Sequence, residues 1–102
     1  MLQAAASAAA FQTVLRSQIV ALRAVVLERR AAADRYRASA IQGSDVLERI
    51  ARVSYDAGER GILELLDAYR SGATARVRSA ALDAAVRQAE IELEFVSGWE
   101  IQ

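Results

Sequence analysis

Apolar side chains recur at helical spacing along almost the whole chain, in two stripes whose steps are three, four or seven residues. The first stripe consists of Phe11, Leu15, Ile19, Leu22, Val26, Ala33, Tyr36, Ala40, Leu47, Ile50 and Val53 or Ser54. The second consists of Leu63 or Leu66, Tyr69, Ala73, Val77, Ala80, Ala84, Gln88, Ile91 and Phe95. This pattern predicts two long α-helices that pack against each other along the stripes.

Two glycines, Gly58 and Gly61, separate the stripes. Gly58 can adopt the left-handed conformation that ends a helix, because it has no Cβ atom. Gly61 can cap the next helix, with Glu64 at the third helical position and able to reach back toward the cap. We therefore expect a helix over about 3–57, a turn at 58–61, a helix over 62–97 and a short tail at 98–102, with Gly98 as the stop. With such a turn, residue number i of the first helix lies opposite the residue of the second helix whose number is about 119 minus i.

The segment from Ile41 to Asp45 is the weak point of the first predicted helix. Gly43 costs about 1 kcal/mol in a helix interior relative to alanine, and Ser44 or Asp45 can cap a fresh helix start. Two interpretations stay open, a continuous helix with a kink or two separate helices. The apolar stripe keeps nearly the same phase across the gap, which favours continuity.

Composition narrows the fold to a single thin helical domain. The chain has 102 residues, and its 54 % hydrophobic content is rich in alanine, which fills little volume. We expect an all-α, coiled-coil-like antiparallel hairpin, with the outer faces of its helices poorly covered. Bare apolar faces favour self-association, so we expect two hairpins to pair into a four-helix bundle.

The residue types present argue against catalysis and against nucleic-acid binding. The chain has no cysteine, proline or histidine, so it lacks disulfides, thiolate ligands and the commonest general base. Its 13 basic and 13 acidic residues are interspersed, and no basic patch emerges. We find no nucleophile with a base and no gathered carboxylates, so we expect no enzyme activity, no cofactor and no metal site.

The glycine turn and the helix after it carry a resemblance to a known family. Tyr55 and Gly58 are followed by leucines, acidic residues and an alanine-rich charged helix, as at the periplasmic tip of the outer-membrane efflux protein family. The heavy-metal branch of these TolC-like ducts is the most similar, on Ala57-Gly58-Glu59 and Leu65-Leu66-Asp67-Ala68-Tyr69-Arg70. The resemblance is dense over about residues 45 to 98.

The resemblance implies roles for the residues of the turn. In this family of trimeric exit ducts, the tyrosine and arginine matched by Tyr55 and Arg60 tie neighbouring hairpins together at the periplasmic entrance. The acidic positions matched by Glu64 and Asp67 ring the pore, although Glu64 stands where aspartate is usual. The tip formed by Gly58, Glu59, Arg60 and Gly61 corresponds to the surface that meets a periplasmic adaptor protein. A solvated turn with ordinary surface charges is the alternative interpretation.

The resemblance also implies a location and a larger context. The family's ducts have a signal, membrane strands and two helical repeats, whereas this chain supplies one hairpin. We therefore expect a carboxy-terminal fragment of such a protein, or a truncated reading frame, whose full-length relatives lie in the outer membrane and periplasm. The apolar run from Ile19 to Leu27 is interrupted by Arg23, and a span needs about 20 apolar residues. The start of the chain lacks the positive charge of a secretory signal, so this chain alone is expected to be soluble. A free-standing helical oligomerisation module without a transport role is the rival interpretation.

Overall fold

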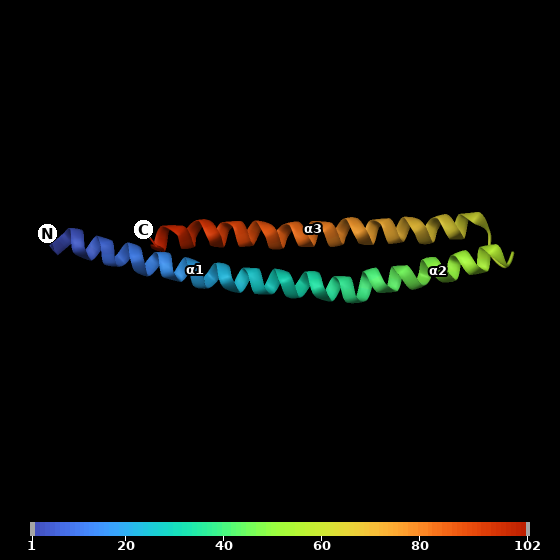
Figure 1. The fold of residues 1–102 in the computed structure, drawn as a ribbon, viewed down its shortest axis with the longest axis horizontal. Coiled ribbons are helices and arrows are strands. Elements are labelled where there is room, and N and C mark those ends of the chain that lie inside the picture. The colour runs from blue at the N-terminus through green and yellow to red at the C-terminus, as the bar shows by residue number, and fades with distance from the viewer. Residues whose placement is uncertain (1, 102) are drawn as a thin grey trace.

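The chain forms one long antiparallel helical hairpin (Figure 1), described here by a computed structural model that covers residues 2–101 and the side chains of 4–98. Helix α1 (Leu2–Tyr36) continues through the π-helical turn η1 (Arg37–Ile41) into α2 (Gln42–Asp56). Helix α3 (Ile62–Ile101) returns beside them, and no strand occurs in residues 2–101. The rod measures 83 × 16 × 15 Å, and the amino-terminal part of α1 extends beyond the end of α3.

The chain reverses at the glycine pair. Gly58 has a φ of 75°, in the left-handed region that favours glycine. The amide of Gly58 donates to the carbonyl of Tyr55 at 3.0 Å, and that of Glu59 donates to Ser54 at 2.9 Å, which closes the end of α2. The carbonyl of Gly61 accepts from Leu65 at 3.4 Å, the first hydrogen bond of α3. Glu64, expected to reach back toward this cap, lies instead 3.6 Å from Arg60.

The first apolar stripe lies against α3 over most of α1. Leu15, Ile19, Val26 and Ala33 are buried, and the residues between and after them on the same face are half-buried. Phe11 is the exception and is exposed, in the part of the helix that extends beyond α3 (Figure 1). The helical period thus predicted the packed face of α1.

Beyond η1, the packing face predicted from this stripe is wrong. Leu47, Ile50 and Val53 are 61 %, 49 % and 63 % exposed. The residues that face α3 are Glu48 and Ala51, each one position after the predicted residue, and Ser54, which the stripe offered as the alternative to Val53. The cause is the π-helical turn, which holds one more residue per turn than an α-helix and so shifts the downstream face by one position. The helix does continue across the weak point, with Gly43 inside α2.

The stripe predicted for α3 lies on its outer face. Leu63, Val77 and Phe95 are among its most exposed members. The side that packs against α1 and α2 is lined by a different set, Leu65, Ala68, Gly72, Ala75, Ser79, Leu82, Val86, Ala89, Leu93 and Val96. Both faces of α3 are apolar, so the period alone did not distinguish them. The inner set is richer in small residues at its centre, where the helices approach closely.

The end of α3 also differs from expectation, because the helix runs through Gly98 to Ile101. A glycine ends a helix when it adopts a positive φ, and among the described glycines only Gly58 does so. Within the predicted tail of 98–102, the side chains of residues 99–102 lie outside the described part.

Polar contacts set the register between the two arms. Arg30 pairs with Glu90 at 3.1 Å, and Arg37 pairs with Asp83 at 2.8 Å. The guanidinium of Arg29, on the seam, donates to the carbonyl of Ala85 at 2.9 Å. Exposed ion pairs are each worth about 0–1 kcal/mol, so they contribute more to register than to stability.

We expect the hairpin to lose stability in acid partly through Glu90. Its hydrogen bond from Arg30 lowers the pKa of the Glu90 carboxyl from the usual 4.5. A lowered folded-state pKa stabilises the fold above the unfolded-state value, and this contribution is lost as the pH falls through the folded-state value. Thermal unfolding followed by circular dichroism should show a smaller drop in midpoint below pH 4.5 for Glu90→Gln. Glu92→Gln, at an exposed position on the same helix, is the control, and equal acid sensitivity of both variants would contradict the assignment.

Candidate functional site at the turn

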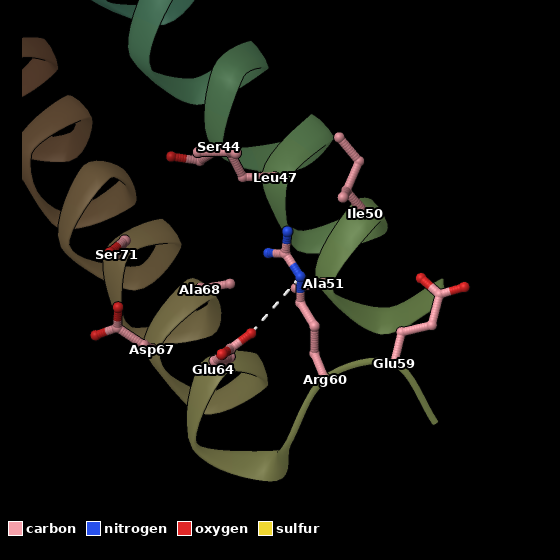
Figure 2. Close-up of a pocket in the computed structure, with 10 residues that line it drawn as sticks. All are labelled: Ser44, Leu47, Ile50, Ala51, Glu59, Arg60, Glu64, Asp67, Ala68 and Ser71. Atoms are coloured by element: carbon pink, nitrogen blue, oxygen red, sulfur yellow. Dashed lines mark ion pairs between the residues drawn. The ribbon is translucent and has the colours of Figure 1, made fainter. Parts of the chain in front are cut away.

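The charged residues singled out in the sequence come from three consecutive parts of the hairpin. Tyr55 lies in the last turn of α2, Arg60 lies in the turn between the helices, and Glu64 and Asp67 lie on one face of the first turns of α3. The Arg60 Nε atom is 3.6 Å from a Glu64 carboxylate oxygen. In Figure 2, Arg60 stands between α2 and α3 with its guanidinium toward Glu64.

Three of these residues, all but Tyr55, border an open hollow of about 670 Å³ between α2 and α3. Arg60, Glu64 and Asp67 supply charged lining, and Leu47 and Ile50 supply apolar lining from α2. The full lining is Ser44, Leu47, Ile50, Ala51, Glu59, Arg60, Glu64, Asp67, Ala68 and Ser71. Tyr55 is not part of it, so the structure brings three of the four predicted gating residues together and leaves the fourth apart.

Leu47 and Ile50 were missed as site residues because the helical period assigned them to the seam. The shift arises in the π-helical turn Arg37–Ile41, before the suspect segment around Gly43, and the residue types of this turn carry no signal of their own. The extra residue in this turn moves Leu47 and Ile50 from the seam between the helices to the hollow.

The four residues of the predicted docking tip are all exposed. A Cβ atom added at Gly58 or at Gly61 meets nothing within 4 Å. Gly58 is therefore required by its φ of 75° rather than by lack of space, and Gly61 is not required by sterics. The tip is therefore exposed at all four positions, with open space beside both glycines.

The arrangement offers charge rather than bond chemistry. Within the described residues, no group of three or more histidine, cysteine, aspartate or glutamate side chains is placed to hold a metal ion. Arg60 and Glu64 are both more than half exposed along their side chains. Such groups can pair with charges on a neighbouring chain, or set the sign of charge along a passage.

The apolar outer faces form a second feature that a partner can use. We call the exposed set on α3 the outer stripe, and its members are Leu66, Tyr69, Ala73, Val77, Ala80, Ala84, Ile91 and Phe95. Toward the open end of the hairpin, an apolar hollow of about 600 Å³ lies between α1 and α3 and includes Leu22, Ile91 and Phe95. Contiguous exposed apolar surface is a common feature of interaction sites.

One helical stretch, Ala4–Asp56, is long and apolar enough to cross a membrane by length and composition, with a best-window mean hydropathy of 1.3. No membrane-spanning stretch was expected from the sequence, because Arg23 interrupts the apolar run from Ile19 to Leu27. A single stretch of this kind is a weak indication, since core helices of soluble proteins and signal sequences meet the same criterion.

Comparison with known proteins gives no relative. Neither the protein-family models, nor the curated proteins, nor the solved structures include a match to this chain.

Proposed function

We propose that this hairpin is a piece of the helical periplasmic tunnel of an outer-membrane efflux duct that exports metal ions or drugs. In that role the turn forms part of the periplasmic entrance and of the surface that docks an adaptor protein. The mechanism is passive, because hairpins move apart to let solutes pass and no bond is made or broken. The proposal draws on the resemblance of residues 45 to 98 to that family.

The observation that carries the proposal is that apolar surface lies on the inner and the outer side of the same hairpin. A hairpin that worked alone would need only its inner seam. Here α3 has the outer stripe, and α2 exposes Val46, Leu47, Ile50 and Val53. A closed ring of hairpins covers such faces, because each hairpin packs between two neighbours.

The charges at the turn suit an entrance. Glu64 and Asp67 would line a ring of copies with negative charge, which favours the passage of cations. Tyr55 is 40 % exposed, and its hydroxyl makes no hydrogen bond among the described residues. It is available to a neighbouring hairpin.

The proposal is tested with a chimera in which residues 1–102 replace the matching hairpin of a heavy-metal efflux duct. We expect cells with the chimera to keep their metal tolerance, because the seam, the outer stripe and the tip are supplied together. The control carries Val77→Asp in the outer stripe and should lose tolerance through failed assembly. A chimera that reaches the outer membrane as a trimer yet gives no tolerance would contradict the proposal.

The second candidate, a free-standing oligomerisation module, is supported by the same exposed outer stripe. Two hairpins that bury their outer stripes against each other form a four-helix bundle. This candidate requires no adaptor and no duct. It is favoured if the isolated chain forms a stable dimer and the chimera fails to assemble.

A further inference from the structure

Helix α2 packs with the less apolar of its two available faces. Toward α3 it directs Ser44, Glu48, Ala51 and Ser54. One residue earlier in each case lie Gly43, Leu47, Ile50 and Val53. In an uninterrupted helix through residues 37–41, the buried stripe of α1, whose steps alternate between four and three residues, would continue at Gly43, Leu47 and Ile50 and reach Ser54. Gly43, Leu47 and Ile50 would then face α3, and Ser54 would face it in either case.

The present register depends on the π-helical turn and on the contacts around it. Arg37 in η1 donates to Asp83 on α3 at 2.8 Å and to Asp34 at 3.3 Å. Beyond the turn, Arg76 on α3 donates to both oxygens of Glu48, at 2.9 and 3.0 Å. The Glu48 carboxylate lies against Gly72, where any Cβ atom would collide with it. These contacts offset the exposure of Leu47 and Ile50.

We propose that η1 is a register switch for the tip half of the hairpin. With the π-helical turn present, Glu48 and Ala51 face α3. When the turn becomes α-helical, each residue of α2 takes the place now held by the residue after it, and Leu47 and Ile50 face α3 instead. The rotation is about 100°, the angle between successive residues of an α-helix.

The turn between α2 and α3 can absorb this rotation. Neither Gly58 nor Gly61 has a side chain to obstruct it, and nothing lies within 4 Å of where their Cβ atoms would be. The ion pair between Arg60 and Glu64 joins the turn to α3 rather than to α2, so it does not resist the rotation.

The switch changes the hollow beside the turn. Ile50 and Leu47 now supply its apolar wall. In the other register Arg49 takes the place of Ile50, and Val46 takes the place of Leu47. A guanidinium then lies across from Glu64 and Asp67, so the hollow gains one basic side chain in place of Ile50, while Val46 keeps the place of Leu47 apolar. The device therefore alters which neighbour the tip half can accept, and it does not depend on the efflux assignment.

The test measures distances between spin labels in the full chain, which contains no cysteine of its own. Labels at Arg52→Cys on α2 and Arg70→Cys on α3 report the rotation, and dilution with unlabelled chain restricts the measurement to single hairpins. We expect two distance populations that differ by up to about 10 Å, the diameter of a helix with its side chains. Labels at Arg23→Cys and Gln88→Cys, which lie before η1 and on α3, should give one.

Deletion of Ser39 removes the extra residue and keeps Glu48 and Ala51 inward without a π-helical turn. We expect this variant to give the single distance of the present register, and deletion of Ala38 to do the same. Ser39→Ala keeps the residue count and should keep both populations. One population in the unmodified chain, or two after either deletion, would overturn the proposal.

Discussion

Replacement of Ala89 by aspartate is expected to unfold the hairpin. Ala89 is 0 % exposed, at the point where α3 lies against α1. A carboxylate there loses its water, and aspartate is too short to reach solvent along the seam. A buried unpaired charge costs about 3 kcal/mol or more, a large fraction of the stability of a small domain. The loss should appear as a missing cooperative transition in thermal unfolding followed by circular dichroism at 222 nm.

Ala84→Asp is the matched control for this result. It makes the same substitution on the same helix, so the lower helix propensity of aspartate, at most about 0.7 kcal/mol, is common to both variants. Ala84 lies in the exposed outer stripe, so we expect the helix to persist. Sedimentation should instead show weaker self-association. Equal unfolding by both substitutions would mean that the packed face of α3 has been misassigned.

Ala84 and Ala89 also show which part of the packing could not be predicted from the sequence. The two glycines and the helical period were enough to predict an all-α hairpin and the buried residues Leu15 to Ala33. They were not enough for α3, where Ala84 and Ala89 look alike in sequence. A period identifies a face only when the other faces are polar, and on α3 they are not.

The tip half of the first arm shows a different limit. Leu47 and Ile50 continue the apolar stripe of α1 in phase, and an α-helix would have buried them. A π-helical turn has no composition signal of its own in the segment 37–41, since alanine, serine and isoleucine occur there as in any helix. The offset of one residue follows from backbone geometry, and with it the residues that line the hollow beside Arg60.

The charged residues of the candidate site could be predicted from the sequence, but the residues that surround them could not. Arg60, Glu64 and Asp67 are brought together by the local spacing of a turn and a helix start, which sequence gives directly. Tyr55 lies apart from them because it precedes the reversal and belongs to the other arm.

Loosening of the entrance is the second large effect that we expect. In the chimeric duct, Tyr55→Phe together with Arg60→Ser should raise single-channel conductance in planar bilayers several-fold. The physical reason is that the Tyr55 hydroxyl has no partner within the described part of its own hairpin. Among the described residues, the Arg60 guanidinium makes only the 3.6 Å contact with the exposed Glu64, so both side chains are available to tie one hairpin to the next.

The control for that measurement is Arg52→Ser, which removes an exposed arginine of α2 that lies away from the turn. It changes the net charge of the hairpin as Arg60→Ser does, so any purely electrostatic effect on conductance should appear in both. An increase that is confined to the Tyr55 and Arg60 variants would therefore reflect lost ties between hairpins. Unchanged conductance in a duct that inserts normally would leave the turn as a solvated loop, because the outer stripes alone can hold a ring together without any gate at its tip.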